Sequence, residues 1–422
     1  MYKDVKIGRR PPLSMEQITA LLGRWEGHRV GSVRRFEAGQ KGPTAQVWIE
    51  LAAEPNRRLT CSGCGRTVSR IHDCRLREIR DLPILEAQSH LVVFRRRVLC
   101  PHCGPKLEQL SWLDPYARVT RRLAESIARL CALLPIKHVA HYYGLHWETV
   151  KQIHKQYLQQ SLGPIDLSGV TAIVIDEFAI HKGHRYATVI ADPYTKRVLW
   201  VGRGRSREDI RPFFELLGPE GRRRLQVAVM DMNGAYEEEV RYQCPLAEVV
   251  YDLFHVVAKY GREVIDRVRV DQANRLRADK KARQVVKSSR WLLLRNKENL
   301  PRREDRIRLR ELLAANRPLL TAYVLKDDLK HLWDYRYPKA AQRFWKQWYS
   351  RAIRSRIEPL KSFASKLKPY LHGIIAHCRW PLHTSVIEGI NNKIKVIKRM
   401  AYGFRDDEYF FLRIRAAFPG IP

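Results

Sequence analysis

Acidic residues are scarce in this chain of 422 residues, where 44 Asp and Glu stand against 78 Lys and Arg. The formal net charge is therefore +34. A charge excess of this size needs an anionic partner, and duplex DNA carries about one phosphate charge per 1.7 Å of its axis. The basic residues are spread along the whole chain rather than gathered on one amphipathic helix, which argues against a membrane surface as that partner.

Long apolar runs are also missing, since no stretch approaches the roughly 20 residues that a membrane helix needs. The first ten residues, MYKDVKIGRR, lack the apolar segment of a secretory signal. We therefore expect a soluble cytosolic chain without a membrane partner. Hydrophobic residues nevertheless make up 45% of the chain, which excludes a mostly disordered basic tail and provides material for real cores. The length allows roughly two to four domains.

The cysteines form two C-x-x-C pairs, Cys61 with Cys64 and Cys100 with Cys103, and each pair is followed by a glycine. A glycine there lets the backbone turn tightly enough for both thiolates to face one metal. Cysteines in a cytosolic chain are reduced, so the spacing predicts a structural zinc site with these four ligands. Three further residues could each replace one ligand: His72, Cys74 and His102. The remaining Cys131, Cys244 and Cys378 are expected to be small core residues.

Helices and strands around this cysteine module follow from the spacing of apolar residues. Before it, we expect an amphipathic helix over Met15–Trp25 and two strands near residues 30–36 and 45–51. After it, residues 136–154 read as helix, turn at Gly144 and helix, which is typical of a helix-turn-helix. An ordinary helical hairpin gives the same pattern. If the segment binds DNA, the residues facing the groove or the phosphates are His146, Thr149, Lys151 and Gln152.

From residue 171 to residue 257 the pattern is three strands, a helix, a strand, a helix and a strand, which is the order of an RNase H-like core. The strands are expected at residues 172–175, 186–191, 197–201, 225–230 and 247–251. Four of them lead directly into an aspartate: Asp176, Asp192, Asp231 and Asp252. Asp192 begins Asp-Pro-Tyr-Thr, which favours a hairpin turn. Asp176 and Asp231 are therefore the candidate metal ligands, with Glu177 as a rival to Asp176.

A third carboxylate is expected from a helix packed beside the sheet, and Glu388 is the candidate. At about 100° per residue, Ile387, Ile390, Ile394 and Ile397 share one face of that helix, while Glu388, Asn392, Lys395 and Arg399 share the other. Carboxylate oxygens suit Mg²⁺ or Mn²⁺. Two such ions about 3.5–4 Å apart would promote attack on a phosphodiester. The residues of this helix expected to contact DNA phosphates are Asn391, Asn392, Lys395, Lys398 and Arg399.

The run Ile387-Glu-Gly-Ile-Asn-Asn-Lys-Ile-Lys-Val-Ile-Lys-Arg, followed by Ala401-Tyr-Gly-Phe-Arg-Asp, resembles the C-terminal signature of bacterial insertion-sequence transposases of the ISL3 family. The resemblance covers most of the chain and implies Asp176, Asp231 and Glu388 as a DDE metal-binding triad. Asp252-Leu-Phe-His255 resembles the C/D-x-x-H signature of related transposases, which implies His255 as an active-site neighbour. One departure is that residues 383–387 are more apolar than the family pattern.

The resemblance implies a transposase that binds its own terminal inverted repeats in double-stranded DNA, cuts a strand, and joins the freed 3′-hydroxyl to target DNA. It further implies a homodimer or larger assembly on DNA, and a place in the bacterial cytoplasm with the nucleoid. Two alternatives stay open. One is a zinc and helix-turn-helix regulator with an inactive RNase H-like domain, and the other is an RNase H-like nuclease or resolvase.

The expected fold is thus multidomain. Its parts are an N-terminal region (1–112) with a four-cysteine zinc-binding β module (about 58–110), a helix-turn-helix domain (113–165), the first part of an RNase H-like α/β core (166–258), an α-helical insertion (259–375) and the C-terminal part of the core with the catalytic helix (376–422).

Overall fold

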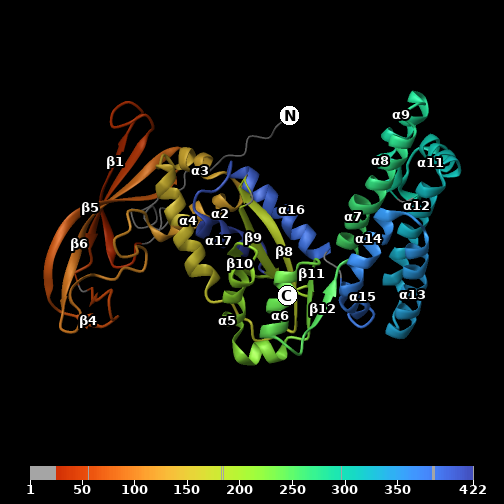
Figure 1. The fold of residues 1–422 in the computed structure, drawn as a ribbon. Helices are drawn as coiled ribbons and strands as arrows, with labels where there is room; N and C mark the ends of the chain where they lie inside the picture. Colours follow the sequence, from red (N-terminus) through yellow and green to blue (C-terminus); the bar gives the residue numbers. More distant parts are fainter. Residues whose placement is uncertain are drawn as a thin grey trace, which may run out of the picture. The chain divides into compact units, whose positions relative to one another are not determined.

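The computed structural model describes residues 25–421 apart from 56, 182, 184, 296, 383 and 384. The chain divides between Gly163 and Pro164 into two compact units (Figure 1). The helix expected over Met15–Trp25 lies outside the described residues except for Trp25, and His383 and Thr384 lie outside them as well. No helix within the described ranges is long and apolar enough to cross a membrane.

The first unit begins with a twisted sheet in the order β1-β2-β6-β5, with β7 paired to the end of β6. Ile49, Leu91 and Val93 lie on its buried face. The sequence predicted β1 and β2, but it did not predict β5, because the first eight residues of that strand are mostly exposed on both faces and so show no apolar alternation. The strands of this unit are β1 (His28–Phe36), β2 (Gln46–Ala53), β3 (Leu59–Thr60), β4 (Thr67–Val68), β5 (Ile71–Ile84), β6 (Ala87–Cys100) and β7 (Gly104–Leu107).

Three helices complete the first unit: α2 (Arg121–Leu133), α3 (Ile136–Tyr143) and α4 (Trp147–Leu162). Thr120 caps α2 by accepting a hydrogen bond from the backbone N–H of Leu123. The turn between α3 and α4 is made by Gly144, whose φ of +59° is the left-handed conformation that glycine adopts without strain. Val139 and Val150 are both buried between these helices. The helices therefore follow the predicted helix-turn-helix pattern.

The second unit contains a five-stranded sheet in the order β10-β9-β8-β11-β12. Strands β8, β9 and β10 are antiparallel, while β11 and β12 run parallel to β8. The elements are β8 (Ala172–His181), β9 (Arg185–Ala191), β10 (Val198–Arg203), α5 (Arg207–Arg224), β11 (Val227–Met230), α6 (Gly234–Gln243) and β12 (Glu248–Tyr251). The largest difference from the predicted boundaries is in β8, which continues past residue 175 to His181, because β9 pairs with it along this whole length.

Helices α7 to α15 form a segment between β12 and the last two helices of the chain (Figure 1). They are α7 (Leu253–Tyr260), α8 (Asp266–Arg275), α9 (Lys280–Ser288), α10 (Arg290–Leu294), α11 (Arg303–Ala315), α12 (Arg317–Lys330), α13 (Pro338–Arg354), α14 (Glu358–Leu367) and α15 (Leu371–Ala376), with a π-helical turn at Gly261–Ile265 and 3₁₀ turns at Lys297–Asn299, His331–Asp334 and Lys368–Tyr370.

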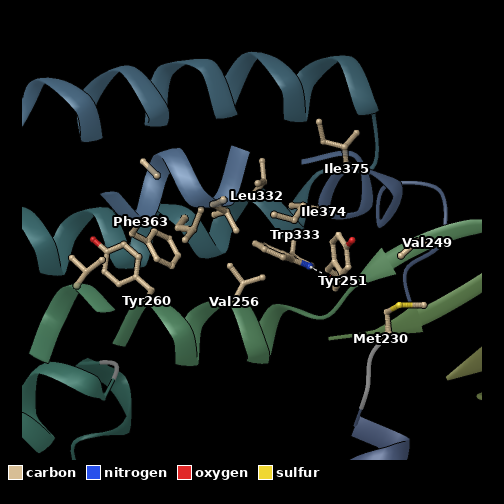
Figure 2. Close-up of a cluster of buried hydrophobic side chains, with 14 of the residues drawn as sticks. Met230, Val249, Tyr251, Val256, Tyr260, Leu332, Trp333, Phe363, Ile374 and Ile375 are labelled. Atoms are coloured by element: carbon tan, nitrogen blue, oxygen red, sulfur yellow. Dashed lines mark hydrogen bonds between the residues drawn. The ribbon is translucent and has the colours of Figure 1, made fainter. Parts of the chain in front are cut away.

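This helical segment shares one hydrophobic core with the sheet. Figure 2 shows Trp333 beside Tyr251 of β12, where the indole N–H of Trp333 donates to the backbone oxygen of Tyr251 at 3.4 Å. Trp345 and Trp348 are also buried, whereas Trp291 is 65% exposed. The helices are thus anchored to the edge of the sheet by aromatic packing.

The chain ends in α16 (Ser385–Met400) and α17 (Asp407–Ala417). Helix α16 packs against β8, and α17 packs against β10 (Figure 1). Ile387, Ile390, Ile394 and Ile397 are all buried, so the predicted apolar face of α16 is the face that meets the core. The end of the chain therefore returns to the strand that carries Asp176.

Candidate active site and metal-binding cluster

Asp176 and Asp231 lie side by side because of the register between two parallel strands. Val229 of β11 pairs with Val174 of β8. Continued by two residues, this register sets Asp231 beside Asp176. Because side chains alternate along a strand, both carboxylates then lie on the same face of the sheet. Asp176 is an internal residue of β8 and not its last one. Strand β11 ends at Met230, but β8 continues beyond that point because it still pairs with β9 along its other edge.

The third predicted carboxylate, Glu388, comes from the first turn of α16. It lines a cavity of about 1070 Å³ together with Asp176, Asp231 and His255. The structure thus brings together all four residues predicted for the active site. The other lining residues are Glu177, Phe178, Ala179, Phe254, Ile387, Asn391, Asn392, Ile394, Lys395, Lys398, Arg399, Tyr402 and Gly403.

Both oxygens of Asp176 are held by hydrogen bonds. The backbone N–H of Glu177 donates to Oδ1 at 2.8 Å, and the side-chain amide of Asn391 donates to Oδ2 at 2.7 Å. The orientation of the Asp176 carboxylate is therefore fixed from its own strand on one side and from α16 on the other.

The position of Asn391 corrects one prediction. Asn391 was expected to face DNA phosphates with its neighbour Asn392, but it is only 8% exposed and lies on the buried face of α16. The reason is helical spacing, since Asn391 follows Ile387 by four residues and precedes Ile394 by three. A polar residue within that apolar stripe was the sequence signal for an inward role, and it was missed.

Burial makes the ionised forms of the two aspartates unfavourable. It raises the pKa of Asp176 from its ordinary 3.8 to about 6, with the neighbouring Asp231 and Glu177 adding to the shift and His255 opposing it. Burial also raises the pKa of Asp231, and His255 again opposes the shift. Within the described residues, Oδ1 of Asp231 is buried without a hydrogen-bond partner. Clustered hard oxygen donors of this kind fit a divalent cation such as Mg²⁺ or Mn²⁺.

Glu177, the rival to Asp176, has a charged partner of its own. Its carboxylate forms an ion pair with Arg205 at 3.1 Å. Glu177 also lines the cavity, but Arg205 already balances its charge. Asp176, whose partners are a backbone N–H and a neutral amide, is the better candidate for a cation ligand.

His255 lies in the first turn of α7. Asp252 caps this helix, because its Oδ2 accepts from the backbone N–H of Phe254 at 3.1 Å. The cap starts the helix where β12 stops, which places His255 at the cavity. Asp192 accepts hydrogen bonds from Tyr194 and Thr195 within the β9–β10 turn, as its sequence predicted.

The cationic side of α16 lines the same cavity, with Asn392, Lys395, Lys398 and Arg399 present as predicted. Lys398 donates to the backbone oxygen of Ala179 at 3.0 Å, and Lys395 donates to Asn392 at 3.3 Å. The cavity therefore has carboxylates at one part of its wall and cations at another. That combination suits a metal ion and a phosphate bound together.

In the first unit, Cys61, Cys64, Cys100 and Cys103 form a compact cluster, with all four Sγ atoms within 4.8 Å of one another. The Sγ atoms of Cys64 and Cys100 are 3.6 Å apart. Tetrahedral zinc with Zn–S bonds of about 2.3 Å needs S–S separations of about 3.8 Å, so the cluster fits zinc. The φ angles of Gly65 (+72°) and Gly104 (+67°) confirm the tight turns that the glycines predicted.

The thiols of the cluster do not ionise alike. Backbone N–H groups of Cys103 and His102 lower the pKa of Cys100 to about 6, which stabilises its thiolate, whereas a hydrogen bond with Cys64 and burial raise the pKa of Cys103. The three alternative ligands lie outside the cluster: His72 bonds to Asp73, His102 contacts Arg66, and Cys74 is exposed. Cys131 and Cys244 are buried as expected, and Cys378 is partly buried.

The predicted DNA-facing residues of the helix-turn-helix lie at the start of α4. His146 caps the helix by accepting from the backbone N–H of Glu148 at 3.4 Å, and Thr149 and Gln152 are exposed. Glu148 accepts from Lys151 at 2.8 Å and from Gln152 at 3.0 Å. The acidic side chain therefore orients two of the four predicted contact residues.

Comparison with known families gives matches along most of the chain. Residues 57–103 match the zinc-finger of transposases IS204, IS1001, IS1096 and IS1165, and residues 108–158 match the helix-turn-helix domain of transposase family ISL3. Residues 173–414 match the transposase domain of the ISL3 family. The last of these ranges contains every residue of the cavity described above.

Two relatives match this chain over most of their length. The chain is 53% identical over 400 residues to the transposase for insertion sequence element IS1001 of Bordetella parapertussis, covering 94% of this chain and 97% of that protein. It is 27% identical over 396 residues to the transposase for insertion sequence element IS1557 of Mycobacterium tuberculosis (strain CDC 1551 / Oshkosh), covering 88% of each.

Proposed function

Because the chain belongs to the ISL3 family of insertion-sequence transposases, we propose that it cuts and joins DNA at a DDE-type site formed by Asp176, Asp231 and Glu388. The observation that carries this assignment is the convergence of the three carboxylates on one cavity. Asp176 comes from β8, Asp231 directly follows β11, and Glu388 comes from α16 near the other end of the second unit. The family is that of a DNA-acting enzyme, and the residue roles are our proposal.

The arrangement of the second unit supports an RNase H-like core. Along the chain its elements follow the predicted succession of three strands, a helix, a strand, a helix and a strand. In the sheet, in the order β10-β9-β8-β11-β12, three antiparallel strands are joined by two parallel ones. Helices α7 to α15 then form the insertion between the fifth strand and the helix carrying Glu388. In this assignment the insertion separates Glu388 from Asp231 in sequence but not in space.

The three carboxylates would hold Mg²⁺ or Mn²⁺, which when bound would supply activation of a water or 3′-hydroxyl and stabilisation of the leaving oxygen. The chain's own residues then have two tasks. Asp176 is held in one orientation by the N–H of Glu177 and the amide of Asn391. Lys395, Lys398 and Arg399, which line the same cavity, attract the phosphates, and such contacts position a strand without reading its bases.

The helix-turn-helix binds DNA, and we propose that its substrate is the terminal inverted repeat of the element. His146, Thr149, Lys151 and Gln152 are placed at the start of a second helix, where such motifs contact base edges and phosphates. Cutting and joining two ends requires both to be held together, so we propose a homodimer or larger assembly on DNA. The enzyme would then act with the nucleoid in the bacterial cytoplasm.

A strand-transfer assay with pre-cleaved ends and Mg²⁺, scored for both cutting and joining, tests the proposed function. Joined product supports a transposase. Cutting without joining would instead indicate a nuclease or resolvase. Specific binding that survives in Asp176→Ala and Asp231→Ala, without any metal-dependent cleavage by the wild type, would indicate a regulator with an inactive core.

A further inference from the structure

We propose that Asn391 is a further member of the active-site cation set, which supplies its side-chain oxygen as a neutral ligand while its amide holds Asp176. This inference rests on the proposed function of the cavity. It adds Asn391, which the sequence had led us to expect at DNA phosphates, to the three carboxylates predicted from sequence.

The first observation is the burial of Asn391. Only 8% of its surface is exposed, and it lies in the isoleucine stripe of α16 between Ile387 and Ile394. Burying an amide among apolar side chains costs free energy unless each polar atom has a partner. A leucine or isoleucine at this position would continue the stripe without that cost.

The second observation is that only one end of the amide is used. Nδ2 donates to Oδ2 of Asp176 at 2.7 Å. Within the described residues, Oδ1 is buried and has no hydrogen-bond partner. The reverse orientation of the amide would set two acceptor oxygens against each other, so the donation to Asp176 fixes Oδ1 as the free end.

The third observation is a second unpartnered oxygen at the same cavity. Oδ1 of Asp231 is also buried without a partner, and both Asp231 and Asn391 line the cavity with Asp176 and Glu388. One hard cation would supply the missing partner of both oxygens, Oδ1 of Asp231 and Oδ1 of Asn391, next to the carboxylate of Asp176. Asparagine oxygens are ordinary ligands of such ions, and a neutral ligand adds no further repulsion between the carboxylates.

A role confined to packing explains less. The hydrogen bond to Asp176 alone accounts for Nδ2 but leaves Oδ1 buried without a compensating partner. Either role can change the affinity of the site for the metal, because Asn391 also orients Asp176. Only a ligand, however, brings the side-chain oxygen of Asn391 onto the metal itself.

The test measures the binding of Mn²⁺ to the zinc-loaded full chain without DNA. The electron paramagnetic resonance signal of free Mn²⁺ reports how much of the metal remains unbound. Asn391→Ala and Asn391→Leu are expected to weaken Mn²⁺ binding by about 10- to 100-fold, which is the range found for residues that support a metal site. Val396→Ala is the matched control, since Val396 lies on the solvent side of the same helix and does not line the cavity. It is expected to bind Mn²⁺ like the wild type.

A measurement that needs no change at Asn391 guards against variants that do not fold. With ¹³C at the side-chain carbonyl carbon of asparagine, a ligating Oδ1 gives a ¹³C hyperfine coupling to Mn²⁺, and the coupling should persist in Asn392→Ala. Absence of that coupling, or wild-type affinity in a folded Asn391→Ala, would overturn this inference alone. If the wild type itself binds no Mn²⁺, or if Asp231→Asn does not change the binding, the proposed metal site fails as well.

Discussion

Asn391 in helix α16 donates a hydrogen bond of 2.7 Å to Asp176 in strand β8, 215 residues earlier in the chain. This contact joins the helix that carries Glu388 to the strand that carries the first aspartate. The two parts of the proposed RNase H-like core are therefore connected through the active site itself. A change at either residue is expected to affect both the geometry of the site and the docking of the helix.

The raised pKa of Asp176 predicts how stability depends on pH. Burial raises this pKa from 3.8 to about 6, so between those values the folded protein binds more protons than the unfolded chain, and its stability falls as the pH rises. A shift of this size corresponds to about 3 kcal/mol. In buffer without Mg²⁺ or Mn²⁺, Asp176→Asn should therefore raise the free energy of unfolding above pH 6 by up to about 3 kcal/mol.

Urea unfolding of both proteins at pH 4 and pH 7.5 measures this difference. The stabilisation by Asp176→Asn should be present at pH 7.5 and absent at pH 4. Equal effects at both values would show that burial does not penalise the charged carboxylate.

The zinc cluster predicts a loss of metal and of folding together. Cys61→Ser and Cys100→Ser should each remove the bound zinc, about one ion per chain, and unfold the cysteine module, because a structural zinc site contributes directly to folding. Cys74→Ser is the matched control, since Cys74 is exposed and outside the cluster. Elemental analysis and circular dichroism of the purified variants report both effects. A folded wild type without zinc would refute the site.

The start of α4 predicts two separable effects on DNA binding. Gln152→Ala should cost about 1–3 kcal/mol in discrimination between the terminal repeat and unrelated DNA if Gln152 contacts a base edge. Lys151→Ala should weaken binding to all sequences and reduce the slope of log K against log salt by about one. Titrations at several salt concentrations with both DNAs separate the two. Identical behaviour of the variants would contradict the assignment of roles within the helix.

Trp333 predicts the strength of the contact between the helical segment and the sheet. It is 8% exposed and packs against Tyr251 (Figure 2), so Trp333→Ala should destabilise the second unit by about 3–5 kcal/mol. Trp291 is 65% exposed, and Trp291→Ala should change stability by less than about 0.5 kcal/mol. Denaturant unfolding of the two variants, monitored by tryptophan fluorescence, compares their losses of stability. Similar losses in both variants would show that Trp333 does not anchor the segment.

Much of this organisation could be predicted because its signals are local. The C-x-x-C pairs, the Gly144 turn and the isoleucine spacing of α16 each lie within a few residues, and the structure shows the expected cluster, turn and buried face. The position of β5 could not be predicted, since most of its first half is exposed on both faces. The inward orientation of Asn391 had a local signal, but its partner Asp176 could not be named, because only the tertiary fold brings the two together.

The proposed catalytic triad is tested most directly by strand transfer of pre-cleaved ends in Mg²⁺ with single-residue variants. The loss of a metal ligand removes several kcal/mol of stabilisation, so Asp231→Asn and Glu388→Gln should join DNA at least about a thousandfold more slowly than the wild type, while binding the terminal repeat normally. Joining by either variant at the wild-type rate would contradict the assignment of these carboxylates.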